Sequence, residues 1–209
     1  MPVHLCPVPG PLYTVLMGYK ESPVAEARRR FTARVGELFS TFFAEHRTCL
    51  VAAMGGGADL VVPVPSSSRP GRASLERAEG LGDLAVATLG GGARWVPPLL
   101  RRSSGEIGHM HPNAQAFAVP DSWLPTVKRS RVLLLDDTYV SGARAQSAAA
   151  ALRLSGARAV LIVPLGRVLR PERSALHAAF VEQSTGGGHR PRCVAVQAGM
   201  GVQAGTGMG

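Results

Sequence analysis

Two adjacent aspartates, Asp136 and Asp137, follow directly on a run of apolar residues and precede a Ser-Gly turn. The run Val132-Leu133-Leu134-Leu135 is continuously apolar, which is typical of a buried strand in a parallel sheet. We expect both carboxylates at the carboxyl end of that strand, where open α/β sheets bind their ligands. Their chemistry suits hydrogen bonds to sugar hydroxyls or contact with a divalent cation.

The turn after the aspartates has the features of a phosphate site. Ser141 and Gly142 lead into an Ala-rich helix that begins near Ala143. The backbone N–H groups of such a turn converge on one point, and the helix N-terminus adds partial positive charge there. A phosphate beside two carboxylates indicates a sugar phosphate as the ligand. The alternative is a buried strand that ends in an acidic turn without a ligand, because Asp and Gly are ordinary turn residues.

The stretch 131–144, RVLLLDDTYVSGAR, resembles the phosphoribosyl pyrophosphate (PRPP) signature of the type I phosphoribosyltransferases. The resemblance implies that Asp136 and Asp137 hold the ribose 2- and 3-hydroxyls. It also implies that the 5-phosphate is bound by the residues of the turn, which are Thr138, Tyr139, Val140, Ser141, Gly142, Ala143 and Arg144. The family usually has hydroxyl residues where this chain has Val140 and Arg144. Val140 still offers its backbone N–H, and the guanidinium of Arg144 can pair with phosphate.

A second loop follows another apolar run, residues 59–65, and contains Ser66, Ser67, Ser68 and Arg69. In the phosphoribosyltransferases the corresponding loop binds pyrophosphate through backbone amides, so the resemblance implies that role for these four residues. Several hydroxyl donors and an arginine suit a departing diphosphate. The alternative for this segment taken alone is a Pro/Ser turn with a solvated arginine.

The segment 101–117 is polar and irregular, and loops of this length are often lids or binding loops. We expect four of its side chains to contact the acceptor, namely Arg101, Arg102, His109 and His111. The two histidines would face the same way on an extended chain, but no third ligand is spaced to complete a metal site. The alternative is that both are surface histidines.

The order of the segments narrows the resemblance to the ComF-like branch of the family. Residues 12–166 contain, in order, a PVP loop with Arg69 and Arg72, an LLRR stretch, a His/Asn stretch and VLLLDD. Members of this branch are associated with competence for DNA uptake or are uncharacterised phosphoribosyltransferase-like proteins. Two departures are present. The paired cysteines that often precede the domain are missing, and Arg72-Ala-Ser-Leu-Glu76 replaces the Arg-Gly-Phe-Asn-Gln of the branch.

The resemblance implies an enzyme that uses PRPP together with Mg²⁺. It would transfer the 5-phosphoribosyl group to a nitrogenous acceptor, a nucleobase-like compound or an amine, and release pyrophosphate. Asp136 and Asp137 would be the catalytic residues and would be linked to the metal only through PRPP. Two alternatives stay open. One is a PRPP-binding regulator or DNA-uptake accessory protein without turnover, which Val140 and Arg144 favour; the other is a basic nucleic-acid-binding module.

We predict an α/β fold with a parallel, doubly wound sheet flanked by helices, of the type I phosphoribosyltransferase kind. A chain of 209 residues suits one domain with a substantial core. We assign residues 1–183 to that domain, with a small variable hood from residues 1–20 and 94–118. Residues 184–209 are Gly-rich, and we expect a mobile tail there.

Local patterns predict the remaining elements. We expect strands over residues 12–16, 94–100, 159–165 and 193–196, the second of them at a sheet edge because it contains two prolines. We expect one helix capped by Ser22, one that begins after Ser74, and two more over residues 143–155 and 171–183. The helix 143–155 joins two apolar strands, which predicts a right-handed β-α-β unit.

The chain is basic, with a formal net charge of +9 at pH 7, and this favours anionic partners. Because the arginines are spread along the sequence, phosphorylated small molecules fit as well as nucleic acid. The dispersed Cys6, Cys49 and Cys193 argue against a zinc ribbon and a disulfide scaffold. No apolar run is long enough to span a bilayer. We expect a cytoplasmic protein without a membrane partner, and a homodimer is compatible with these features.

Overall fold

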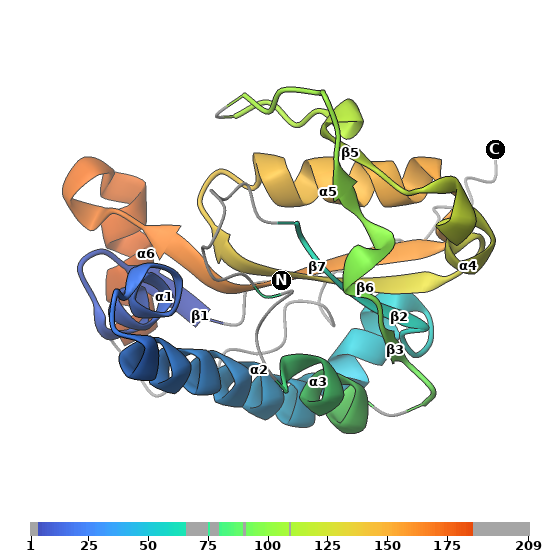
Figure 1. The fold of residues 1–209 in the computed structure, drawn as a ribbon. Coiled ribbons are helices and arrows are strands. Elements are labelled where there is room, and N and C mark those ends of the chain that lie inside the picture. The colour runs from blue at the N-terminus through green and yellow to red at the C-terminus, as the bar shows by residue number, and fades with distance from the viewer. Residues whose placement is uncertain (1–3, 66–74, 76–79, 90, 109, 186–209) are drawn as a thin grey trace, which may run out of the picture.

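A single parallel sheet organises the computed structural model, which describes residues 4–65, 75, 80–89, 91–108 and 110–185 (Figure 1). Its strand order is β1-β7-β6-β2-β3, and every neighbouring pair is parallel. The strands span His4–Pro7 (β1), Ala159–Leu169 (β7), Arg131–Tyr139 (β6), Leu60–Pro63 (β2) and Arg94–Trp95 (β3). Short β3 lies at one edge, as predicted for residues 94–100, but the strand ends before the two prolines, which lie in a 3-10 turn over Pro97–Leu99.

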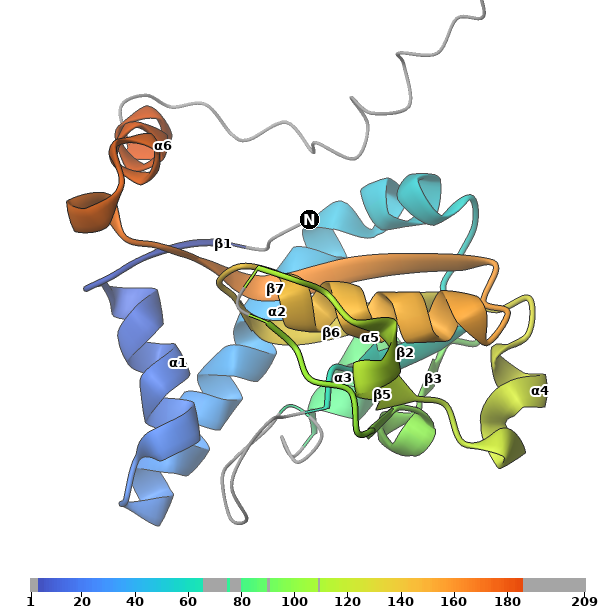
Figure 2. The same cartoon turned by 90° about the horizontal axis from the view of Figure 1, so that it is seen from above.

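Helices cover both faces of this sheet, as Figures 1 and 2 show from two directions. One face carries α1 (Pro11–Glu21), α2 (Ala25–Met54) and α3 (Leu81–Leu89), whereas the opposite face carries α5 (Ala143–Leu154). The predicted α/β architecture, a parallel sheet flanked by helices, is therefore confirmed.

The two faces are built by the alternation of side chains along β6, because successive residues of a strand point to opposite sides. Leu133 and Leu135 belong to the core cluster formed with the buried residues of α1, α2 and α3. Val132 and Leu134 belong to the second cluster, which includes the buried side chains of α5. β6 is thus covered on both sides, as its continuously apolar sequence predicted.

The predicted parallel β-α-β order is confirmed in the β6-α5-β7 unit. β6 and β7 pair in parallel from Arg131↔Ala159 to Tyr139↔Arg167, and α5 connects them across one face. Ala145, Ala148 and Ala151 are buried on α5. Their small side chains let the helix approach the sheet closely.

Helix α2 is the longest element, at 30 residues, and it forms the main support of the opposite face. Its phenylalanines Phe39, Phe42 and Phe43 are buried, so the aromatic stripe is part of the core. The helix ends at Gly55, whose φ of 64° lies in the left-handed region that glycine adopts without steric cost.

The predicted strand over residues 12–16 is wrong, because this segment forms helix α1. Pro11 occupies the first turn, where its missing N–H is tolerated, and Leu16 and Tyr19 lie three residues apart on the buried side. The expected cap at Ser22 is also wrong. Ser22 caps the end of α1 through its backbone N–H to Gly18, and α2 begins later, at Ala25.

The segments assigned to a hood occupy two different places. Residues 4–7 form β1, which pairs with β7 at an edge of the main sheet. In the other segment, β4 (Arg101–Arg102) and β5 (Phe117–Ala118) form a separate antiparallel pair, and the intervening Ala114–Ala116 turn packs against α5. Helix α4 (Leu124–Val127) follows and leads into β6.

Helix α6 (Ala175–Thr185) ends the described chain and corresponds to the predicted last helix. The predicted strand over residues 193–196 and almost all of the Gly-rich tail lie outside the described residues. Within the described part of the chain, no helix has the length and apolar character needed to cross a membrane.

Candidate functional site

The order of the strands in the sheet reverses between the neighbouring strands β2 and β6. The carboxyl ends of these two strands are therefore the expected ligand site. β2 connects through α3 to β3 on one side, whereas β6 connects through α5 to β7 on the other side. Ligands of open α/β sheets bind in the crevice at such a reversal of strand order. The loop after β2 contains Ser66, Ser67, Ser68 and Arg69, and these predicted pyrophosphate ligands lie outside the described residues.

The loop after β6 forms a tight turn that presents unpaired backbone donors. The N–H groups of Val140, Ser141 and Gly142 donate to no oxygen among the described residues, and neither do those of Arg144 and Ala145 in the first turn of α5. Gly142 has a φ of 82°, so the turn passes through the left-handed region immediately before the helix begins. A helix N-terminus with unpaired amides is suited to an anion.

The side chain of Tyr139 packs against this turn at Gly142. A Cβ atom added at Gly142 would lie 2.1 Å from the Tyr139 ring, so only glycine fits at this position. The Tyr139 hydroxyl accepts a hydrogen bond from Gln146 Nε2 at 3.1 Å. The guanidinium of Arg167 on β7 lies 5.3 Å from the centre of the Tyr139 ring. The turn is therefore held by α5 and by the neighbouring strand.

Asp136 and Asp137 lie within the last half of β6 and are buried, with 3% and 7% of their surfaces exposed. Because they are consecutive strand residues, their side chains leave the backbone toward opposite faces of the sheet. Asp136 meets a partner from α5, and Asp137 meets partners from α1. The two carboxylates nevertheless approach one another, because the same nitrogen of Arg144 lies 2.7 Å from Asp136 Oδ1 and 3.6 Å from Asp137 Oδ1.

Arg144 therefore occupies a place that the sequence did not predict for it. We expected its guanidinium at the phosphate, whereas the structure places it on the carboxylates while its backbone N–H remains at the turn. The Arg144 side chain is 26% exposed, which makes it more accessible than the Asp136 carboxylate that it pairs with. A sugar that bonds to Asp136 must share this carboxylate with Arg144 or displace the guanidinium.

Asp137 is held by two side chains of α1. The Tyr19 hydroxyl donates to Oδ2 at 2.8 Å, and the Lys20 ammonium donates to Oδ1 at 2.7 Å. Lys20 also donates to Thr138 Oγ1 at 2.8 Å. These contacts join residues that are 117 and 118 positions apart in the sequence.

The surroundings push the pKa values of the two carboxyls in opposite directions. Burial raises the pKa of Asp136 above its ordinary value, and the adjacent Asp137 charge adds to this, so that the ion pair with Arg144 only partly offsets the rise. Burial also acts upward on the pKa of Asp137, but Lys20 and Arg144 outweigh it and leave that pKa below its ordinary value. Asp137 is therefore the more firmly ionised member of the pair.

Tyr19 and Lys20 are functional candidates that sequence reasoning missed. Both lie just beyond the predicted strand over residues 12–16, on the later turns of helix α1, and no local pattern links them to the aspartates. The structure brings α1 close because two glycines leave room for it. A Cβ atom at Gly18 would lie 2.3 Å from the Phe31 ring of α2, and one at Gly166 of β7 would lie 3.0 Å from Leu16.

The Arg144→Thr substitution tests the ion pair by its effect on stability. We expect the free energy of unfolding to fall by about 3 kcal/mol at pH 7, because the buried Asp136 loses its cation while a quarter-exposed arginine leaves. The pKa of folded Asp136 then rises further above that of the unfolded chain, so stability decreases as the pH rises and the loss is smaller at pH 5.

Urea unfolding at pH 5 and pH 7 measures this difference. Arg153→Thr is the matched control, because Arg153 is an exposed arginine near the other end of α5. Equal losses at the two pH values would contradict the charge pairing.

Comparison with known proteins assigns this chain to no family. No family model matches it, and no curated protein shows a significant match. The function therefore has to be argued from the geometry of the site.

The structure describes three of the four residues that were predicted to contact the acceptor. Arg101 and Arg102 form the exposed strand β4, and the Arg102 guanidinium lies 5.1 Å from the centre of the Phe117 ring. His111 is exposed, and His109 lies outside the described residues. The segment reaches α5 where the Asn113 N–H donates to Ser147 Oγ at 2.8 Å. None of the described members contacts Asp136 or Asp137.

Direct binding of a metal by the two aspartates does not fit this arrangement. Each carboxylate already faces a side-chain cation, Arg144 in one case and Lys20 in the other, and a divalent ion beside them would be repelled. Among the described residues no group of three or more His, Cys, Asp or Glu side chains gathers in the manner of a metal site. The expectation that magnesium arrives with PRPP, without direct protein ligands here, stays a prediction.

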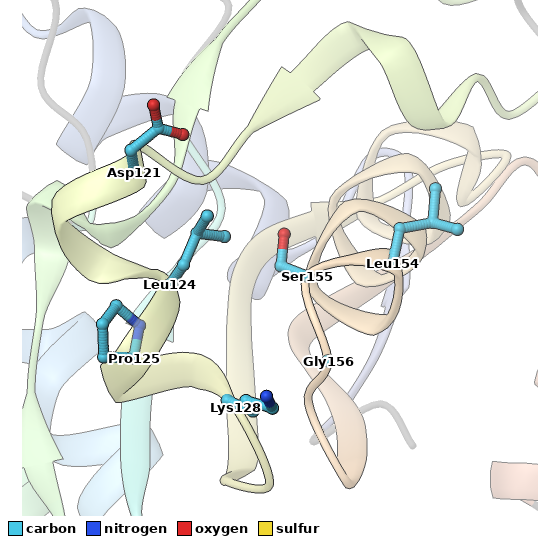
Figure 3. Close-up of a pocket in the computed structure, with 7 residues that line it drawn as sticks. All are labelled: Asp121, Leu124, Pro125, Lys128, Leu154, Ser155 and Gly156. Atoms are coloured by element: carbon cyan, nitrogen blue, oxygen red, sulfur yellow. The ribbon is translucent and has the colours of Figure 1, made fainter.

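A hollow of about 710 Å³ lies at the far end of α5 (Figure 3). Leu154, Ser155 and Gly156 line it on one side, and Leu124 and Lys128 line it on the other. These residues precede β6, or end or follow α5, so the hollow lies at the amino ends of the strands, away from the two aspartates. It brings together neither paired carboxylates nor a turn of unpaired amides.

Proposed function

We propose that this chain is a phosphoribosyltransferase of the type I, ComF-like kind. It transfers the 5-phosphoribosyl group from PRPP to a nitrogenous acceptor and releases pyrophosphate. The parallel α/β sheet with a ligand site at its strand reversal supports this proposal. So does the sequence of the β6 turn.

One observation carries the proposal: a pair of buried carboxylates lies within one arginine side chain of a turn with unpaired amides. Arg144 contributes its backbone N–H to the first turn of α5 and reaches Asp136 and Asp137 with its guanidinium. A ribose 5-phosphate likewise presents hydroxyls and a phosphoryl group within one molecule. Carboxylates accept from hydroxyls, and amides at a helix N-terminus donate to phosphate.

The described residues would bind and orient the donor. The amides of residues 140–142 would hold the 5-phosphate, while Asp136 and Asp137 would hold the ribose hydroxyls and fix the anomeric carbon toward the acceptor. The negative charge of firmly ionised Asp137 would stabilise positive charge that develops on the ribose ring as pyrophosphate departs. The acceptor would enter between this site and the segment 101–117.

Two measurements test the proposal. Calorimetric titration with PRPP and Mg²⁺ should show binding at one site per chain, and ribose 5-phosphate should compete with it. Incubation with PRPP and a panel of nucleobases and amines should then release pyrophosphate with at least one acceptor. Failure of PRPP to bind would remove both the enzyme and the regulator from consideration.

A second candidate function, a PRPP-binding regulator without turnover, is favoured by the ion pair between Arg144 and Asp136. The family usually has a hydroxyl residue at position 144, which would leave Asp136 open to the sugar. An arginine that must be displaced at each cycle favours holding a ligand over rapid exchange. PRPP binding without pyrophosphate release from any acceptor would favour this candidate.

A further inference from the structure

The ammonium of Lys20 bridges two neighbouring residues of β6. It lies 2.7 Å from Asp137 Oδ1 and 2.8 Å from Thr138 Oγ1, and its side chain is 16% exposed. An ammonium has three N–H donors, and among the described residues Lys20 uses two of them. The third is available to an oxygen atom of a ligand that enters the site.

The position of Lys20 is fixed by the packing of α1. Tyr19, the preceding residue, is fully buried and bonds to the other oxygen of Asp137. Gly18 lets α1 lie directly against Phe31 of α2, and Leu16 packs over Gly166 of β7. Both oxygens of Asp137 are thus bonded to consecutive residues of one anchored helix, which determines the orientation of the carboxylate.

The charge balance around Asp137 depends on Lys20. Among the described residues, the titratable and charged groups that face the carboxylate are those of Tyr19, Lys20, Asp136 and Arg144. On β7, Arg167 lies over the Tyr139 ring instead. Arg144 is nearer to Asp136, at 2.7 Å, than to Asp137, at 3.6 Å. Without Lys20, one arginine would face two buried carboxylates, and both could not remain ionised.

We propose that Lys20 is a positioning residue of the candidate site, whose ammonium holds Asp137 charged and correctly oriented for a bound sugar hydroxyl. The identity of the sugar rests on the proposed function above, whereas the effect of Lys20 on Asp137 does not. The N-terminal helix α1 then belongs to the binding site itself. A purely structural role, in which Lys20 only ties α1 to β6, is the alternative that the experiment must separate.

The experiment uses the full chain and compares Lys20→Met with Lys20→Arg and Lys128→Met. Lys128 is the matched control because it is exposed, lies at the opposite end of the sheet and is the only other lysine of the chain. Carbon-13 NMR titration of the aspartate carboxyls, without any ligand, gives the titration midpoint of Asp137. Calorimetry with PRPP and Mg²⁺ between pH 5 and pH 8 gives the affinity.

In the ligand-free protein we expect Asp137 to titrate below an ordinary aspartate, to move upward in Lys20→Met and to stay unchanged in Lys128→Met. PRPP affinity at pH 7 should fall roughly ten- to a hundredfold in Lys20→Met, as for the loss of a charged hydrogen bond. The loss should shrink as the pH rises, because Asp137 then regains its charge. Lys20→Arg should retain most of the affinity, since the charge is kept.

Several outcomes would overturn the inference. An ordinary or raised titration midpoint for Asp137 in the wild-type protein would do so, whether or not the variants fold. A loss of affinity in Lys20→Met that is the same at every pH would indicate only a structural tie. If PRPP fails to bind the wild-type protein but the Asp137 titration behaves as expected, the proposed function fails and the role of Lys20 stands.

Discussion

Replacing Asp136 and Asp137 together by asparagine is expected to abolish measurable PRPP binding in calorimetry and, with it, any release of pyrophosphate. Asparagine keeps the size of each side chain but removes the charge that strengthens a hydrogen bond from a sugar hydroxyl. The loss of two such hydrogen bonds corresponds to a fall in affinity of roughly a hundred- to ten-thousandfold. No other substitution in the described residues removes as much of the expected ligand contact.

Asp59→Asn is the control for this experiment. Asp59 also contacts an arginine of β6, since its Oδ2 accepts from the Arg131 backbone N–H at 2.7 Å. Arg131 begins β6, so this contact lies at the opposite end of the strand from the acid pair. We expect this variant to bind PRPP normally. Undiminished binding by the double asparagine variant, with its fold verified by circular dichroism, would show that the acid pair does not hold the ligand.

We expect the second large effect from Gly142→Ala, which distorts the turn that we propose as the phosphate site. The alanine must adopt a φ near 82°, and its Cβ would lie 2.1 Å from the Tyr139 ring, so the turn must move. We expect the free energy of unfolding to fall by about 1–3 kcal/mol from backbone strain and crowding. PRPP affinity should fall by more than this change in stability alone explains, because the amides of residues 140–142 no longer converge.

Gly156→Ala isolates the backbone contribution to that result. Gly156 lies just beyond the other end of α5 with a φ of 93°, and a Cβ atom there would meet nothing closer than 3.6 Å. Thermal unfolding of both variants, combined with PRPP titration, separates the two effects. If Gly156→Ala weakened binding as much as Gly142→Ala, the geometry of the turn would not be the cause.

The part of the site that lies along one continuous stretch of chain could be predicted from the sequence. The apolar run before Asp136, the Ser-Gly turn and the alanines of α5 each have a local pattern, and a β-α-β connection has a strongly preferred hand. The strand β6, the turn and helix α5 therefore appear where they were expected. The parallel pairing of β2 with β6 agrees with the predicted parallel sheet, whereas no local pattern predicts the strand order.

The partners of the aspartates could not be predicted, because they depend on contacts between distant segments. Residues 12–16 are apolar and lie between prolines, glycines and polar residues, and in so short a window this pattern is ambiguous between strand and helix. The strand prediction for this window is wrong, and the helix that continues through Tyr19 and Lys20 is missed with it. Tyr19 and Lys20 reach Asp137 because Gly18 and Gly166 leave space for α1, and only the packed structure reveals that space.

The role of Arg144 shows a different limit of sequence reasoning. Its position in the signature predicted contact with phosphate, and its backbone does lie at the turn. Its side chain is long and flexible, however, and buried carboxylates nearby attract it more strongly than the solvent does. Charge pairing within the folded chain thus places the guanidinium on the carboxylates, where the sequence did not predict it.

The dependence of Asp137 on α1 makes the first helix a reporter of ligand occupancy. A molecule that competes for the oxygens of this carboxylate weakens the bonds from Tyr19 and Lys20, so the end of α1 opens more often and its amides exchange with solvent deuterium faster. A molecule that accepts the existing bonds and adds to them slows the same exchange. The direction of that change distinguishes displacement from completion of the network, without any measurement of turnover.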